Sequence, residues 1–205
     1  MTRFIDLGCK EGGSFHLAAH YFGLNESDGL GMDYNEKSVA KAREKGYNVV
    51  QGDVMKFDEI LGLTDGVEYI TASHILEHMK NEEDYFILLD KIMRYAIRGV
   101  LLATPCFDGD GKLREMGLRT YYSHWSDHNA NVPLTELMTV IMERYRYTSL
   151  KLEMRTPIYD SSATEIHSLD SAIDQLHYDA NIHPPKPLVK FDFPLYREFR
   201  LIIMK

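Results

Sequence analysis

The chain has 205 residues, of which 44% are hydrophobic and 26% charged, enough for one good core but short for two domains. It contains no run of about 18 apolar residues, which excludes a transmembrane helix, and its net charge of -8 disfavours broad electrostatic binding to nucleic acid. The two cysteines, Cys9 and Cys106, lie far apart in the sequence, and no signal-peptide pattern precedes the first apolar run. We therefore expect no disulfide framework and a cytoplasmic location.

Strand and helix patterns alternate through the first half of the chain. Apolar runs predict buried strands over residues 3–7, 29–33, 47–51, 67–72 and 99–103. Apolar residues at helical spacing predict helices over 14–22, 35–45 and 82–95. Such alternation predicts an α/β fold with a mostly parallel, doubly wound sheet, whose ligand binds at the carboxyl ends of the strands.

The last third of the chain departs from this alternation. The pattern predicts a helix over 134–147 and strands over 148–155 and 197–204. A flap, residues 157–195, lies between the two strands and is too long for a plain hairpin turn. Its tract His183-Pro-Pro-Lys-Pro187 is stiff and extended, which favours a folded flap over a flexible linker.

A glycine-rich turn, Asp6-Leu-Gly-Cys-Lys-Glu-Gly-Gly-Ser14, follows the first predicted strand. A turn between a buried strand and a helix is where backbone N–H groups and a helix N-terminus meet a polar ligand. Lys10 stands where a dinucleotide-binding Gly-x-Gly-x-x-Gly motif needs its second glycine, so a nicotinamide cofactor is disfavoured. The simpler interpretation, that Gly8 and Gly12 only turn the chain, stays open on this pattern alone.

Acidic residues mark the ends of the next two strands. Asp33-Tyr34 ends the second strand, and Asp53-Val54 follows the third. Each acid has a structural alternative, because Asp33 would serve as a helix cap and Asp53 as the first residue of a type I turn. The carboxyl ends of parallel strands share one edge of a sheet, so we expect both acids and the glycine turn to face one crevice.

A fourth motif, Ser73-His-Ile-Leu-Glu-His78, follows the fourth strand. With these four motifs in order, nearly the whole chain resembles the class I S-adenosylmethionine-dependent methyltransferases, and the fourth is most similar to small-molecule members. The resemblance implies a Rossmann-like sheet of seven strands, mostly parallel with an antiparallel last strand, in a single domain over residues 1–205. It implies an enzyme that uses S-adenosyl-L-methionine to methylate oxygen or nitrogen of a small-molecule or glycan-type acceptor.

The resemblance also implies where the cofactor lies. Gly8 and Gly12 would let the backbone approach its methionine part, Asp33 would bond both ribose hydroxyls, and Asp53 would bind the adenine amino group. The cofactor-binding residues that it implies are Asp6, Gly8, Cys9, Lys10, Gly12, Ser14, Asp33, Tyr34, Asp53, Val54, Ser73 and His74.

Three further residues concern the methionine end of the cofactor. Ser73 and His74 would lie beside it. Lys10 replaces the middle glycine of the family's Gly-x-Gly-x-Gly pattern, and its ammonium would either pair with the cofactor carboxylate or face solvent. This departure bears on how tightly the cofactor is held.

Methyl transfer to a hydroxyl or an ammonium requires that a proton be removed, and histidine titrates near the working pH. His124 is the first candidate for this base, with His128 and His78 as alternatives. The loop 107–130 and the flap 157–195 are expected to cover the acceptor. The loop carries basic and aromatic side chains that suit an anionic or sugar-containing small molecule, Lys112, Arg114, Arg119, Tyr121, Tyr122 and Trp125. The alternative is a solvated loop whose Trp125 plugs the core.

Two further chemistries are disfavoured by the sequence. His74-Ile-Leu-Glu-His78 formally fits a zinc-peptidase pattern, but it begins directly after a strand rather than inside a helix, so we expect no metal. Cys106 follows the fifth strand and would suit the nucleophile of a cytosine methyltransferase, but we interpret it as a packed residue. A cofactor-binding protein without methyl transfer and a nucleic-acid methyltransferase remain as alternatives.

Overall fold

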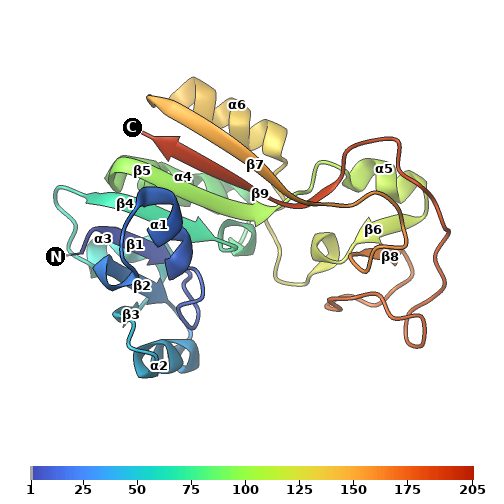
Figure 1. Cartoon of the computed structure of the whole chain (residues 1–205), viewed down its shortest axis with the longest axis horizontal. Helices are drawn as coiled ribbons and strands as arrows, with labels where there is room; N and C mark the ends of the chain where they lie inside the picture. The colour runs from blue at the N-terminus through green and yellow to red at the C-terminus, as the bar shows by residue number, and fades with distance from the viewer. Residues whose placement is uncertain (1) are drawn as a thin grey trace.

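The computed structural model describes residues 2–205, which form a seven-stranded sheet with flanking helices and a smaller lobe beside it (Figure 1). The strands of the main sheet are β1 (Phe4–Leu7), β2 (Gly29–Asp33), β3 (Val49–Gln51), β4 (Val67–Ser73), β5 (Ala96–Pro105), β7 (Ser149–Pro157) and β9 (Tyr196–Met204). Their order is β3-β2-β1-β4-β5-β9-β7, and β9 runs antiparallel to both of its neighbours. The expected doubly wound sheet with an antiparallel last strand is confirmed.

The four predicted helices agree with the structure to within a few residues, and the structure adds two short helices that were not predicted. The helices are α1 (Phe15–Phe22), α2 (Glu36–Glu44), α3 (Phe57–Ile60), α4 (Glu82–Tyr95), α5 (Asp110–Glu115) and α6 (Leu134–Arg144), with 3-10 turns η1 (Glu26–Asp28), η2 (Val54–Lys56), η3 (Leu76–His78) and η4 (Tyr122–His124). The last helix ends before the predicted residue 147 because Tyr145 takes an extended backbone. No helix within residues 2–205 is long and apolar enough to cross a lipid bilayer.

Side chains alternate between the two faces of the sheet along each strand. Ile5 and Leu7 of β1 belong to a core that includes the apolar sides of α4 and α6. Phe4 points to the opposite face and packs with Phe15 of α1 and Val39 of α2. Because both faces are covered, most residues of the parallel strands are apolar, which is why the sequence shows nearly continuous apolar runs rather than alternation.

Two insertions form the smaller lobe. The loop 107–130 contributes α5 and β6 (Leu118–Thr120), and the flap 157–195 contributes β8 (Ile166–Ser168), which pairs antiparallel with β6. We call these two segments together the insertion lobe. It has its own apolar cluster, which includes Leu113, Leu118 and Ile166. The flap is therefore folded, as the proline tract predicts, and Figure 1 shows it lying beside the sheet near the start of β9.

The strand order of the sheet changes direction between β1 and β4. Strands β2 and β3 follow on one side of β1, whereas β4 and β5 lie on the other. Open parallel sheets bind ligands in the crevice outside the carboxyl ends of the strands at such a switch point. The fold thus places Gly8, Asp33, Asp53 and His74 at one edge of the sheet.

A buried histidine makes the insertion lobe sensitive to acid. Burial, with the nearby charges of His183, Lys186 and Arg119, lowers the pKa of His167 to about 4. The folded lobe thus favours the neutral ring, and this contribution is complete above pH 6.5 and is lost as the pH falls toward 4. We expect His167→Phe to reduce the acid destabilisation of the lobe by up to about 3 kcal/mol.

Hydrogen exchange of the β6 and β8 amides at pH 7 and pH 4.5 checks this expectation. The exposed His20, on α1, provides the control variant His20→Phe. Equal acid sensitivity in His167→Phe and the wild type would contradict it.

Candidate functional site

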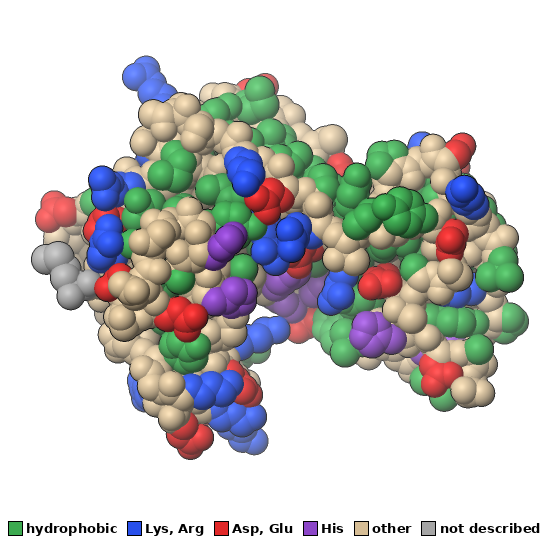
Figure 2. Space-filling model, viewed as in Figure 1, with side chains coloured by type: hydrophobic (Ala, Val, Ile, Leu, Met, Phe, Trp, Pro, Cys, Tyr) green, Lys and Arg blue, Asp and Glu red, His purple; other side chains and the backbone are tan. Residues whose placement is uncertain are grey.

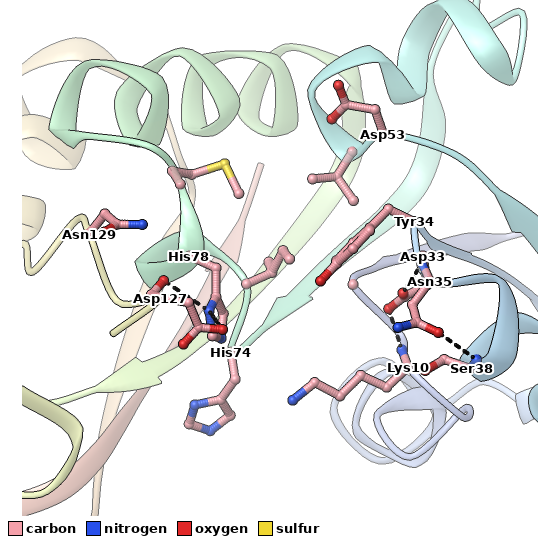
Figure 3. Close-up of a pocket in the computed structure, with 14 residues that line it drawn as sticks. Lys10, Asp33, Tyr34, Asn35, Ser38, Asp53, His74, His78, Asp127 and Asn129 are labelled. Atoms are coloured by element: carbon pink, nitrogen blue, oxygen red, sulfur yellow. Dashed lines mark hydrogen bonds and ion pairs between the residues drawn. The ribbon is translucent and has the colours of Figure 1, made fainter. Parts of the chain in front are cut away.

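A cleft of about 510 Å³ opens at the carboxyl ends of β1, β2, β3 and β4 (Figure 3). Seven of the residues expected to bind the cofactor line it, Gly8, Lys10, Asp33, Tyr34, Asp53, Val54 and His74. Its volume lies within the range of roughly 300–1,000 Å³ of sites for small molecules and cofactors. The cleft therefore brings together residues from four separate strand ends.

Asp33 occupies a buried position at the end of β2, and its carboxylate organises the glycine-rich turn. One oxygen accepts the backbone N–H of Lys10 at 2.8 Å, and the other accepts that of Asn35 at 2.9 Å. A carboxylate oxygen has two lone pairs, so each keeps one free for a hydroxyl donor. The N-cap of α2 is Asn35, whose side chain accepts the backbone N–H of Ser38. Asp33 is therefore not the helix cap that the sequence allowed as an alternative.

The side of the cleft next to β3 is more open. Asp53 is exposed, and its carboxylate accepts the backbone N–H of Met55 at 2.9 Å while the residue caps the turn η2. Val54 lies buried beside it, and the exposed ring of Tyr34 extends across the cleft in Figure 3. A planar aromatic ligand would have an apolar wall here and a carboxylate at its edge.

The glycine-rich turn uses the left-handed backbone region at three positions. Gly8 has φ +70° and Gly12 has φ +86°, which glycine adopts without steric cost. Lys10 also has a positive φ, +47°, which costs a residue with a Cβ roughly 1–2 kcal/mol. Its side chain is exposed and extends into the cleft on the side of His74 (Figure 3).

Five of the expected cofactor residues stand outside the main cleft. Ser14 and Ser73 line an adjoining cavity of about 300 Å³. Asp6, Cys9 and Gly12 line neither of these two cavities.

These three residues stabilise the turn through hydrogen bonds and packing on the side away from the cleft. Burial raises the pKa of Asp6 to about 6, and its carboxylate accepts hydroxyl hydrogen bonds from Ser14 and Thr71 at 2.5 and 2.6 Å. Burial likewise raises the pKa of the Cys9 thiol. At Gly12 a Cβ would lie 2.2 Å from the Tyr47 ring, so this glycine is required for packing.

His74 lies between two carboxylates just after β4. Its Nδ1 is 3.2 Å from Glu77 and its Nε2 is 3.0 Å from Glu198. Burial alone would lower the pKa of His74, but these two partners outweigh it and raise the pKa to about 9. His74 is therefore an imidazolium at neutral pH rather than a base. The Arg200 guanidinium forms an ion pair with the second oxygen of Glu198, at 2.8 Å.

A second cavity, of about 260 Å³, adjoins the cleft and shares Lys10, His74 and His78 with it. The insertion lobe supplies much of its wall, through Tyr121, Tyr122, Trp125, His128 and Leu176. Figure 2 shows histidine and basic side chains gathered at the hollow between the sheet and this lobe. We call this space the acceptor cavity.

The structure changes the ranking of the candidate bases. His124 lines none of the three cavities, because η4 presents Tyr121, Tyr122 and Trp125 to the acceptor cavity instead. His78 and His128, the alternatives, both line it, with ring centroids 4.7 Å apart. Burial lowers the pKa of His128.

The basic residues of loop 107–130 also do not reach the acceptor cavity. The buried Arg119 donates to the carbonyls of Ser171 and Ala172, and the Lys112 ammonium lies 4.8 Å from the centroid of the Phe193 ring. Arg197 from β9 is the basic residue that reaches it, together with Lys10.

The two disfavoured chemistries find little support in the geometry. Cys106 is buried, and burial raises the pKa of its thiol to about 11, which does not suit a nucleophile. His74 directly follows β4 and has a backbone φ of +51°, which is not helical, and η3 is only one turn long. His74 and His78 therefore do not share one face of a helix, as the two metal-binding histidines of a zinc peptidase must.

Sequence reasoning missed the contribution of β9. Glu198, Arg197 and Arg200 reach the site because an antiparallel strand begins at the edge where the parallel strands end. The sequence signal was present, since charged residues occupy the start of an otherwise apolar strand.

No model of a protein family matches the sequence, and no curated protein sequence matches it. Several solved structures that share the fold are methyltransferases. A SAM-dependent methyltransferase from Archaeoglobus fulgidus has 19% sequence identity and a TM-score of 0.64, over 100% of this chain and 86% of that chain. Magnesium protoporphyrin IX methyltransferase from Synechocystis PCC 6803, with bound SAH, has 13% sequence identity and a TM-score of 0.56. The match covers 100% of this chain and 74% of that chain.

A third structure, the small RNA methyltransferase HEN1, has 14% identity and a TM-score of 0.58. It covers 100% of this chain and 23% of that chain. The chain therefore has the fold of the class I SAM-dependent methyltransferases.

We predict that Asp33→Asn destabilises the protein without any ligand. An amide offers one oxygen where two partly buried backbone N–H groups need acceptors, so one hydrogen bond to a charged group is lost, at a cost of about 1.5–3 kcal/mol. Urea unfolding measures the free energy, and Asp53→Asn is the matched control. The exposed Asp53 serves one N–H group, so its change should stay within about 0.5 kcal/mol. Equal effects in the two variants would contradict the role given to Asp33.

Proposed function

We propose that the chain is an S-adenosylmethionine-dependent methyltransferase that acts on a small-molecule acceptor. The observation that carries the proposal is the convergence of Gly8, Asp33, Asp53 and His74, each from a different strand end, on one cleft at the switch point of the sheet. The methyltransferase fold supports the same conclusion.

The donor set of the cleft fits the cofactor. Asp33 keeps a lone pair on each oxygen for the two ribose hydroxyls, and Asp53 offers an acceptor for the adenine amino group beside Val54. Lys10 lines the cleft, and its ammonium would pair with the carboxylate of the methionine part. The bound cofactor supplies an activated methyl group, and the protein has to align the acceptor with it and exclude water.

The acceptor cavity supports a small acceptor. It joins the cleft at His74, and aromatic walls from Tyr121 and Trp125 suit a ring-bearing or sugar-bearing molecule. At about 260 Å³ it admits a small molecule or the terminal unit of a larger one. The acceptor end of an RNA is the second candidate, favoured by the fold shared with HEN1 and disfavoured by the net charge of -8.

Calorimetric titration with S-adenosylhomocysteine tests the proposal. We expect one binding site, with affinity roughly 10- to 100-fold lower in Asp53→Ala, because a hydrogen bond to a charged acceptor contributes about 1.5–3 kcal/mol. The control is Asp65→Ala, an exposed acid next to the start of β4, at the opposite edge of the sheet from the cleft. Absence of heat with the wild type at millimolar ligand would rule out the proposed function.

Transfer of a labelled methyl group from the cofactor separates the two acceptor classes. Label in the small-molecule fraction of an extract supports the proposal. Label in a ribonuclease-sensitive fraction would show that the acceptor is RNA and not a small molecule.

A further inference from the structure

Three potential metal ligands converge where the cleft meets the acceptor cavity. Glu77, His78 and His128 each offer one ligand atom, and these atoms all lie within 4.8 Å of one another. Two ligands on opposite sides of a first-row ion at about 2.1 Å span roughly 4.2 Å, so shifts of under about 1 Å would close the set around an ion. The hydrogen bond from the Ala130 N–H to the Glu77 carbonyl, at 3.2 Å, fixes the segment that carries His128 against η3.

Glu77 carries the sign that something is missing. It is fully buried, and one carboxylate oxygen contacts His74, but the other, Oε2, has no hydrogen-bond partner among residues 2–205. Leaving a buried polar atom unpaired costs about 1–3 kcal/mol, and more for a charged group. A cation beside this oxygen would remove that cost.

Both histidines are held in the orientation that metal-binding histidines need. Nδ1 of His128 contacts the Tyr122 carbonyl at 2.8 Å, and Nδ1 of His78 contacts the Asp127 carbonyl at 3.2 Å. A carbonyl only accepts, so each Nδ1 carries the proton and each Nε2 keeps a free lone pair. Backbone or carboxylate acceptors at the second ring nitrogen are the usual support of a histidine ligand.

We propose that Glu77, His78 and His128 bind a divalent first-row metal ion, with Mn²⁺ as the probe ion, and that the ion binds a hydroxyl oxygen of the acceptor. Two imidazoles and one carboxylate without a thiolate suit such an ion and leave coordination positions open toward the acceptor cavity. This assignment replaces the sequence-based expectation of no metal, and it makes His78 and His128 ligands rather than bases.

The chemistry rests on the proposed function and narrows it to methylation of a hydroxyl group. An ion lowers the pKa of a hydroxyl that it binds and orients the oxygen. The hydroxyl proton passes to water, an oxygen lone pair forms the new C–O bond to the methyl carbon, and the C–S bond breaks with its electron pair going to sulfur. An acceptor with a second oxygen next to the methylated one would fill a further open position, so acceptors with neighbouring oxygens are favoured.

Titration of the full-length chain with Mn²⁺, followed by electron paramagnetic resonance, tests the site without any activity assay. We expect the wild type to bind one equivalent, and Glu77→Gln and His128→Ala each to weaken binding at least tenfold. His124→Ala is the matched control, because this nearby histidine lines none of the cavities, and it should bind as the wild type does. Mg²⁺, which prefers oxygen ligands, should compete poorly.

Thermal unfolding in a chelator shows whether each variant is folded, and His78→Ala replaces any variant that is not. Stoichiometric Mn²⁺ binding that is unchanged in the ligand variants, or no binding by the wild type, would overturn the metal site. Binding of S-adenosylhomocysteine in the presence of the chelator keeps the two proposals separate. If that binding persists while Mn²⁺ fails to bind, the metal site alone is wrong. If Mn²⁺ binds in the wild type but S-adenosylhomocysteine does not, the proposed function is wrong and the ion site stands.

Discussion

The site depends on the two hydrogen bonds that the Asp33 carboxylate accepts from the backbone of Lys10 and Asn35. They tie the turn after β1 to the end of β2, so that two separate parts of the chain form one wall of the cleft. Asp6 secures the same turn from below through Ser14 and Thr71. A lysine is held at positive φ in this turn, which requires that the surrounding contacts determine the backbone.

The other wall depends on His74. This residue also has a positive φ, and it joins η3 to β9 through Glu77 and Glu198. Because its two partners favour the imidazolium, it acts as a fixed charge that sets the orientation of the Glu77 carboxylate. The cofactor cleft and the candidate metal site thus share one structural element, and a change at His74 should affect both.

The strand ends could be predicted from the sequence because they are local patterns. An apolar run followed by glycine or an acid defines the end of a strand, and parallel topology then places Gly8, Asp33 and Asp53 at one edge. The acceptor side could not be predicted in this way. Part of its wall comes from residues that follow β6 and β8 in the chain. These two strands pair although they are about fifty residues apart, and no local pattern encodes that pairing.

The choice among the histidines shows the same limit. A loop histidine between aromatic residues made His124 a reasonable candidate, but one turn of 3-10 helix decides which side chains reach the cavity. Glu77 was visible only as part of a zinc-peptidase pattern with His74. In the structure, Glu77 and His78 form a cluster with His128 of the insertion lobe, and His74 is not part of it.

A crystal structure with S-adenosylhomocysteine tests the central claim most directly. The account predicts the ribose hydroxyls within hydrogen-bond distance of the Asp33 carboxylate, the adenine beside Asp53 and Val54, and the sulfur toward His74 and the acceptor cavity. Ligand bound away from the strand ends, or with its adenine at His74, would contradict it.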